Sequence, residues 1–331
     1  MKARTATVRD VAELAGVSTA TVSRAINLDS RVAPETAEKV RKAVEELQYN
    51  VNQVARSLKT RATRTVGIVA PELSSGFLMF IAESMDRVLS ARGYGLIICS
   101  SWESASEEAK RLRLLAERDV DGIVIMPALE RGSHILEARE RGIPIVLVDR
   151  FAEEVTCDAV LVDNEGGAYE ATRALIDDGF SRIGYIGGDP NVTTARERYA
   201  GYRRAMREAG LAMESRFESS GSFHIDSGYR SMASLLAQPD APDAYFIVNA
   251  DCHIGATNYL LTEGRAFRDR IVFAAFDEMP YSPLLQFCRY SVSQPMSAIG
   301  ATAARLILDR IEGVRQGGPE VIRLKTTLLR H

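Results

Sequence analysis

The sequence predicts an α/β protein in which an N-terminal head of three helices, containing a helix-turn-helix, precedes two lobes built on doubly wound parallel sheets. Three observations lead to this prediction. About the first fifty residues hold three short segments with the apolar spacing of amphipathic helices, and a tight glycine turn joins the first two. From Val66 onward, short β-branched runs alternate with helical stretches. This alternation occurs in two series, one before and one after about Asp163.

The first helix is predicted to begin at the sequence Thr7-Val-Arg-Asp10, which has the pattern of a capping box. Val11, Leu14 and Ala15 follow at the i, i+3, i+4 spacing of a buried stripe. Gly16 is expected to end the helix, because glycine adopts positive φ angles without strain.

Two further helices are expected in the head. Ser18 can cap a second helix from Thr19 to Asn27. Its inward face consists of Val22, Ala25 and Ile26. Its outward face consists of Thr19, Ala20, Ser23 and Arg24. A third helix is predicted from about Pro34 to Leu47, with proline at its first position and Ala33 offering no capping side chain. Its core positions are Val40, Ala43, Val44 and Leu47.

The remainder of the chain is predicted to contain parallel β-sheets. Its strand candidates are Thr65 to Val69, Gly95 to Cys99, Gly122 to Met126, Ile145 to Val148, Ala159 to Val162, Ile183 to Ile186, Ala244 to Val248 and Ile271 to Phe276. We therefore divide the chain into a head over 1–50, a linker over 51–63 and a large domain over 64–331. Lobe one is expected over about 64–162 with part of 291–331, and lobe two over about 163–290, with a ligand cleft between them.

Charge is distributed unevenly along the chain. Residues 1–64 carry 12 lysines and arginines against 7 acidic residues, a net charge of +5, whereas the rest carries 29 against 37, a net charge of −8. A basic head on an acidic body is the pattern of a nucleic-acid-binding domain joined to a sensor domain, because neutralising phosphates supplies much of the affinity for DNA. The N-terminus is polar and no 18-residue apolar run occurs, which favours a cytoplasmic protein over a secreted or membrane protein.

Metal, disulfide and enzyme classes lack support in the sequence. The cysteines form no CxxC motif and the histidines stand in no ligand-spaced group, so we expect neither a metal site nor a cofactor. The stretch Gly184-Tyr-Ile-Gly187-Gly188 lacks the GxGxxG spacing of a dinucleotide loop, and neither GxSxG nor GxxxxGK[ST] occurs. A generic three-helix bundle for the head and a periplasmic-type sugar-binding protein for the large domain remain as alternatives.

The head resembles one known family closely. The string DVAELAGVSTATVSRAIN, followed by VAPETAEKVRKAVEELQYNVNQVARSLKT, is similar to the DNA-binding head and hinge of the lactose-repressor (LacI/GalR) family of bacterial regulators. The resemblance implies that Thr19, Ala20 and Arg24 face base edges in the major groove, where arginine can contact guanine with two hydrogen bonds. It also implies phosphate contacts by a second set of residues, Ser18, Thr21, Ser23 and Asn27.

The same resemblance implies a hinge helix within 52–59, in which Leu58 is a minor-groove wedge and Asn52 and Ala55 are its neighbours. Val51 departs from the family pattern, because the family usually has proline at this position. A helix this short is marginal alone, so we expect it to form only with a partner subunit and DNA.

The large domain is similar to the effector domain of this family, and through it to periplasmic sugar-binding proteins. The stretches that carry the resemblance include VDGIVIMPA, IPIVLVDR, ARERYAGYRRAMREAGL and IVFAAFDE. It implies an effector site at Asp149, Thr194, Arg198, Phe223, Asn249 and Asp277. Carboxylates accept hydroxyl protons, arginine and asparagine donate to sugar oxygens, and an aromatic ring offers a flat apolar face. The segment Ser74-Ser-Gly-Phe77 and Ala250 depart from common family patterns, so the sequence does not name the ligand.

Together these features predict a sequence-specific DNA-binding transcription regulator, a repressor that a small effector of the sugar class controls. One recognition helix and one hinge helix read half a site, so a homodimer on pseudo-palindromic double-stranded operator DNA is expected. Residues up to His331 contain no leucine-rich heptad tail that would favour a tetramer.

Overall fold

The computed structural model describes residues 6–26, 31–49, 62–267, 269–284 and 287–331. The chain forms two compact units, Met1–Thr63 and Arg64–His331. Within the described residues, no helix has the length and apolar character needed to cross a membrane.

The first unit contains the three predicted helices, α1 (Val8–Ala15), α2 (Thr19–Ile26) and α3 (Pro34–Glu46). The capping box is present, because Thr7 and Asp10 bond to each other's backbone N–H groups. Gly16 ends α1 with a φ of 66°. Ser18 caps α2 by accepting a hydrogen bond from the Thr21 N–H at 3.1 Å. The predicted helix-turn-helix is therefore confirmed in its local chemistry as well as its element order.

One core assignment in the head is wrong. Leu14 was expected to be buried, but 46% of it is exposed. Helical residues turn by about 100° each, which places Val8, Val11, Ala12 and Ala15 within one arc and Leu14 about 110° from its centre. The eight-residue helix buries only Val11 and Ala12 fully, so Leu14 lies on the flank of the head.

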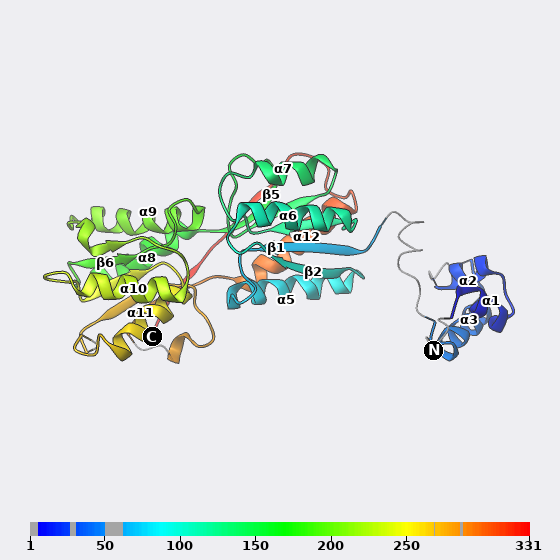
Figure 1. The fold of residues 1–331 in the computed structure, drawn as a ribbon, viewed down its shortest axis with the longest axis horizontal. Coiled ribbons are helices and arrows are strands. Elements are labelled where there is room, and N and C mark those ends of the chain that lie inside the picture. The colour runs from blue at the N-terminus through cyan, green and yellow to red at the C-terminus, as the bar shows by residue number, and fades with distance from the viewer. Residues whose placement is uncertain (1–5, 27–30, 50–61, 268, 285–286) are drawn as a thin grey trace. The chain divides into compact units, whose positions relative to one another are not determined.

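The second unit contains two six-stranded sheets, one in each lobe (Figure 1). The sheet of lobe one has the order β11-β5-β4-β3-β1-β2, and that of lobe two has the order β12-β10-β9-β8-β6-β7. All paired neighbours are parallel except β10 and β12. The bounds are β1 Thr65–Ala70, β2 Gly95–Ser100, β3 Gly122–Ile125, β4 Ile145–Val148, β5 Asp158–Val162, β6 Ile183–Ile186, β7 Glu218–Ser219, β8 Ala244–Ile247, β9 Val272–Phe276, β10 Cys288–Ser293, β11 Val321–Leu324 and β12 Thr327–Arg330.

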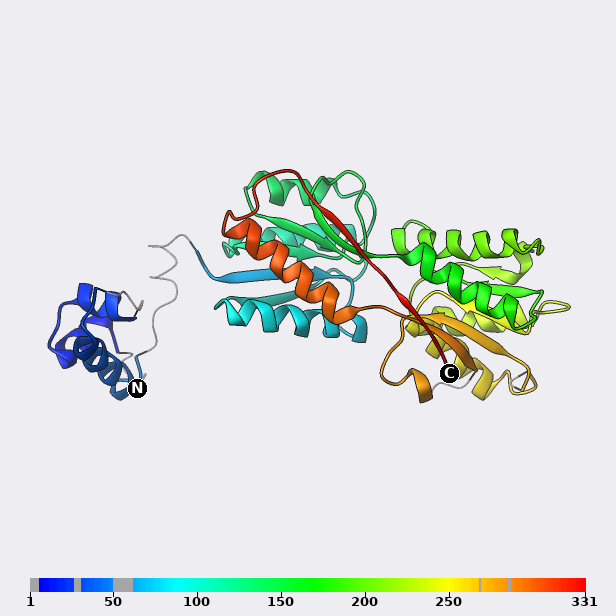
Figure 2. The same cartoon turned by 180° about the vertical axis from the view of Figure 1, so that it is seen from behind.

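Helices cover both faces of each sheet, which confirms the doubly wound fold class (Figures 1 and 2). In lobe one, α5 (Gly76–Ala91) and α12 (Met296–Ile311) pack on one face, and α6 (Ala105–Glu117) and α7 (Ser133–Glu140) on the other. In lobe two, α8 (Asn164–Asp177) and α9 (Thr193–Glu208) pack on one face, and α10 (Ile225–Leu236) and α11 (Ala250–Thr262) on the other. Two short 3₁₀ turns, Ser215–Phe217 and Ser282–Leu284, lie in loops of lobe two.

The chain passes between the lobes three times: after β5, after β10 and between β11 and β12. Figure 2 shows the last of these as the C-terminal segment, which continues from one sheet to the other beside α12. The end of lobe two, predicted at about residue 290, falls inside β10, because this strand pairs with β9 and continues to Ser293. Because only these three connections join the lobes along the chain, the lobes can rotate relative to each other while each sheet stays intact.

Candidate functional site

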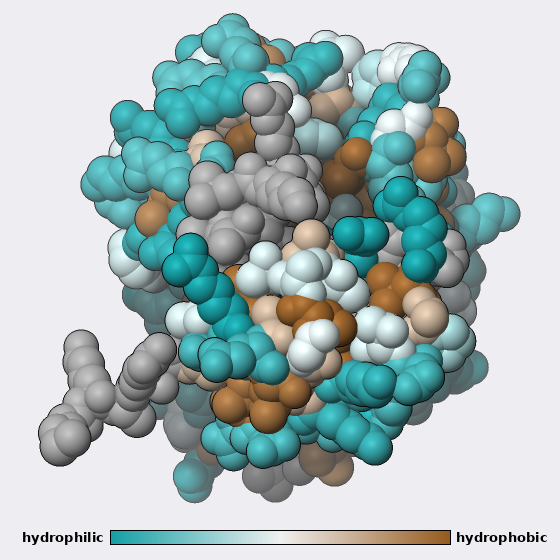
Figure 3. Space-filling model, turned by 90° about the vertical axis from the view of Figure 1, so that its right-hand side faces the viewer, coloured by the Kyte–Doolittle hydropathy of each residue, from teal (hydrophilic) through white to brown (hydrophobic). Residues whose placement is uncertain are grey.

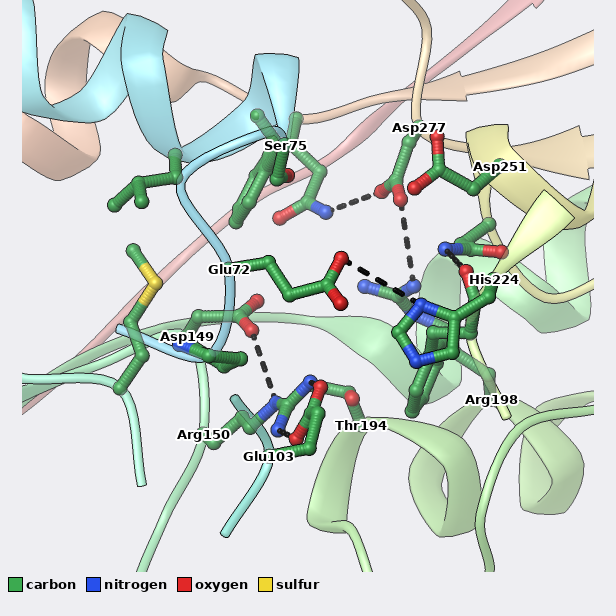
Figure 4. A pocket seen from close by; sticks show the side chains of 17 residues that line it. Glu72, Ser75, Glu103, Asp149, Arg150, Thr194, Arg198, His224, Asp251 and Asp277 are labelled. Carbon is green, nitrogen blue, oxygen red and sulfur yellow. Dashed lines mark hydrogen bonds and ion pairs between the residues drawn. The ribbon is translucent and has the colours of Figure 1, made fainter. Parts of the chain in front are cut away.

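A pocket lies between the two lobes of the second unit and is partly open to solvent. Both lobes contribute to its wall, and Figure 4 shows their side chains facing a common space. All six residues that the sequence indicated for an effector line this one pocket: Asp149, Thr194, Arg198, Phe223, Asn249 and Asp277.

Two aspartates occupy matching places in the two lobes. Asp149 directly follows β4 and Asp277 directly follows β9, at the carboxyl ends of parallel strands, where open α/β sheets bind ligands. Both have left-handed backbones, with φ values of 66° and 71°. Non-glycine residues rarely adopt this conformation, and such residues cluster at functional sites. These turns hold one carboxylate of each lobe at the pocket wall.

Arg198 is a buried cation with its partners already in place. It lies on α9 with 3% of its surface exposed, and its guanidinium carbon is 3.7 Å from the centroid of the Phe276 ring. Its Nε donates to Asn164 Oδ1 at 2.9 Å, and one Nη donates to the Val248 carbonyl at 2.8 Å. The same Nη is 3.8 Å from an Asp277 oxygen. These contacts fix the guanidinium without saturating its five N–H donors.

Asn249 lines the pocket and also stabilises the local structure. Its Oδ1 accepts from the Cys252 N–H at 3.0 Å and so caps α11, and its Nδ2 donates to the Phe223 carbonyl at 2.9 Å. Phe223 is half-buried and lies 5.4 Å from the Arg150 guanidinium, measured from the ring centroid. Thr194, in the first turn of α9, is 2% exposed. Asn249 therefore positions the Phe223 loop and presents only its remaining donor and acceptor capacity to the pocket.

The sequence reasoning missed several residues of the wall. Arg150 forms a bidentate ion pair with Glu103, at 2.7 and 2.8 Å. Arg150 directly follows Asp149 in the stretch IPIVLVDR, so its position next to a predicted site residue indicated a place in the pocket. Glu103 offered none, because a turn with positive φ at both Trp102 and Glu103 brings it to the pocket. The other missed residues of this kind are Glu72, His224, Asp251 and Gln294.

The pocket is acidic. Burial raises the pKa of Asp149 to about 6, and the carboxylates of Asp277 and Glu103 contribute in the same direction, whereas Arg150 and Arg198 oppose the shift. Burial also raises the pKa of Asp251, with further contributions from Asp277 and Glu72. Ionising these carboxyl groups without a ligand therefore costs the folded protein free energy.

We expect Asp149→Asn to stabilise the free protein at neutral pH. The folded-state pKa of Asp149 lies above its ordinary value of 3.8, so the free energy of unfolding falls as pH rises through about 6. The variant removes this cost and should raise the free energy of unfolding at pH 7.5 by up to about 3 kcal/mol. Denaturant titrations at several pH values should show the gain shrinking below pH 6 and disappearing near pH 4. The exposed Asp86→Asn serves as the control, and a gain independent of pH would contradict this account.

In the head, the residues indicated for DNA contact lie on or beside α2. Ser18, Thr19, Ala20 and Arg24 are exposed, while Thr21 and Ser23 are half-buried. The Arg24 Nε donates to the Ala20 carbonyl at 3.3 Å. On the face of the molecule in Figure 3, apolar side chains form small patches among hydrophilic ones. The remaining candidates, Asn27, Asn52, Ala55 and Leu58, lie outside the described residues.

A head with a helix-turn-helix, joined in one chain to a two-lobed domain with a polar pocket between its lobes, defines a ligand-responsive DNA-binding regulator. Comparison with known families agrees. Residues 7–52 match the model of bacterial regulatory proteins of the lacI family, and residues 63–331 match that of periplasmic binding proteins and the sugar binding domain of the LacI family. The chain belongs to the LacI family.

Individual relatives cover almost the whole chain. The HTH-type transcriptional repressor PurR of Vibrio campbellii is 35% identical over 309 residues, which are 93% of this chain and 92% of the relative. PurR of Pasteurella multocida is 34% identical, with 92% of each chain covered. Among solved structures, the transcriptional regulator CelR in complex with cellobiose is 31% identical, with a TM-score of 0.72 and 98% coverage of both chains. The lac repressor dimer bound to operator and an anti-inducer shares the fold, with a TM-score of 0.86 at 21% identity and 99% and 98% coverage.

The protein is therefore a DNA-binding transcriptional repressor with an effector-binding domain, and not an enzyme, as the sequence predicted. The alternative of a periplasmic-type sugar-binding protein without a regulatory role finds no support, because its relatives over the full chain are repressors.

Proposed function

We propose that a hydroxyl-rich small molecule, a sugar or sugar derivative, binds between the lobes and controls the affinity of the repressor for its operator. The observation that carries this proposal is the convergence of Asp149, Arg198 and Asp277 from two lobes on one pocket. Paired carboxylate acceptors and guanidinium donors are the groups that bind neighbouring hydroxyls, and Phe223 supplies an apolar face. The solved CelR relative is a complex with cellobiose, which agrees with this ligand class.

The lobes offer a mechanism for the control. Residues outside the pocket also form contacts between the two lobes. The Phe151 N–H donates to Thr193 Oγ1 at 3.1 Å, and Arg196 forms ion pairs with Glu130 and, at 3.5 Å, with Glu153. Glu72 of lobe one lies 3.5 Å from His224 of lobe two. A ligand that touches both lobes favours one of their relative orientations, and only such a difference in affinity between two states can change DNA binding.

On DNA, the recognition helix α2 presents Thr19, Ala20 and Arg24 to the major groove of a half-site, and Ser18, Thr21, Ser23 and Asn27 hold phosphates. The segment containing Asn52, Ala55 and Leu58 enters the minor groove. A cytoplasmic homodimer reads a pseudo-palindrome of ~16 to 20 base pairs. Ligand binding releases the operator.

A binding screen tests the ligand class. Thermal-shift and calorimetric titrations of the full chain with a panel of pentoses, hexoses and disaccharides should identify at least one stabilising sugar. Asp277→Ala should weaken its binding about ten- to a hundredfold, because a charged hydrogen-bonding partner is lost. If no sugar of the panel binds, or if the variant binds as wild type does, the proposed site is wrong.

A further inference from the structure

The ionisable side chains around the pocket are unequal in number. Five carboxylates line it, from Glu72, Glu103, Asp149, Asp251 and Asp277. The only permanent cations among the described lining residues are Arg150 and Arg198, and His224 is the one further basic group. The wall therefore has an excess of negative charge.

Both arginines are already engaged by acidic groups. Arg150 holds Glu103 through two hydrogen bonds and lies 3.8 Å from an Asp149 oxygen. Arg198 is 3.8 Å from Asp277. Neither guanidinium is thus left as an uncompensated positive charge for an anionic ligand group.

Glu72 and Asp251 have no such compensation. In the described part of the chain, neither forms an ion pair with a lysine or arginine, and the Glu72 contact with His224 at 3.5 Å is charged only when the histidine is protonated. Figure 4 shows Asp251 beside Asp277 and the Glu72 side chain extending into the space between the lobes. The raised pKa of Asp251, to which Asp277 and Glu72 both contribute after burial, is consistent with mutual repulsion among these three groups.

The buried acceptors of the pocket wall also favour a ligand that donates hydrogen bonds. Gln294 is 4% exposed, and its Nε2 donates to Asp277 Oδ1 at 2.5 Å, which leaves its Oε1 as the free end. Among the described lining residues, two buried side-chain atoms have no hydrogen-bond partner: this oxygen and the Nε of Arg150, which lies 3.8 Å from an Asp149 oxygen. The five carboxylates and Gln294 Oε1 nevertheless make the wall rich in acceptors, and a buried acceptor is satisfied only by a donor.

We propose that this pocket selects a donor-rich ligand that is uncharged or positively charged, and that Glu72 and Asp251 exclude phosphorylated and carboxylated sugars. The inference rests on the proposed function and narrows its ligand class. A phosphate monoester carries about −1.5 to −2 charges at neutral pH, and it would meet like charge inside a partly enclosed site, where screening by water and salt is weak. Hydroxyl and ammonium groups meet acceptors at the same positions.

Matched ligands test this inference. Calorimetry on the full chain should compare D-ribose with ribose 5-phosphate, and D-glucose with both glucose 6-phosphate and its amino form, glucosamine. We expect the better of the neutral and amino forms to bind at least about tenfold more tightly than the phosphorylated form. Glu72→Gln and Asp251→Asn should each reduce this ratio several-fold, whereas Glu140→Gln, an exposed change of the same charge on α7, should leave it unaltered.

Each result has a distinct meaning. Equal or tighter binding of a phosphorylated form would overturn the inference while leaving a sugar-responsive pocket in place. Preserved exclusion of phosphate in both variants would overturn the assignment to Glu72 and Asp251. If neither a matched set nor any sugar of the wider panel binds, the proposed function itself fails, and this inference fails with it. The comparison of glucose with glucosamine distinguishes a neutral from a basic ligand within the proposed class.

Discussion

Arg198→Ala is expected to abolish the response to the effector. The arginine stacks on Phe276, bonds to Asn164 and Val248, and lies beside Asp277, so its removal deletes donors from the pocket and leaves Asp277 without a cation. Losing hydrogen bonds from a charged group should weaken ligand binding by about 1.5 to 3 kcal/mol, roughly ten- to a hundredfold. The unpaired partners should also lower the free energy of unfolding by about 3 kcal/mol.

Calorimetry and thermal unfolding of the same preparations separate these two effects. Arg207→Ala, at the exposed end of the same helix, is the matched control and should change neither quantity by much. Asp277→Asn tests the other side of the pair with a smaller change in shape. If Arg198→Ala folds and still binds the sugar as wild type does, Arg198 is a core residue and not part of the effector site.

Arg24→Ala is expected to relax operator specificity. The side chain is exposed on α2, and a guanidinium that contacts guanine with two hydrogen bonds contributes about 1 to 3 kcal/mol of discrimination per base pair. In a dimer the loss occurs in both half-sites. Selection from a random-duplex library, followed by binding measurements at two salt concentrations, should show preference lost at one base pair in each half-site. Equal weakening on every duplex, with a shallower salt dependence, would instead assign Arg24 to a phosphate.

The fold was predictable where local chemistry determines it. Thr7, Gly16 and Ser18 specify the helix ends of the head through their own hydrogen bonds, and all eight strand candidates correspond to observed strands. The four strands that the sequence reasoning did not identify are β7, β10, β11 and β12. β7 has two residues, and β11 and β12 have exposed or half-exposed positions without a clear apolar run. Such strands depend on pairing partners far away in the chain, which a local pattern does not contain.

The pocket residues likewise divide into those that the sequence indicated and those that tertiary contacts place. Asp149 and Asp277 were predictable from the family resemblance of the stretches IPIVLVDR and IVFAAFDE, in which each follows a buried strand. Glu72 and Glu103 were not, because each lies in a loop whose course is set by tertiary contacts, and Gln294 reaches Asp277 only after the chain crosses between the lobes. Leu14 failed for a simpler reason, since apolar spacing alone does not state which side of a short helix the neighbours cover.

Control of operator affinity by a ligand bound between the lobes can be measured directly. Fluorescence anisotropy with the selected duplex should be measured with and without the sugar that binds most tightly, for wild type and Asp277→Ala. We expect the sugar to weaken operator binding by wild type, and we expect the variant to bind the operator as tightly as sugar-free wild type without responding to the sugar. A variant that responds to the same sugar concentration as wild type does would place the sensing site elsewhere.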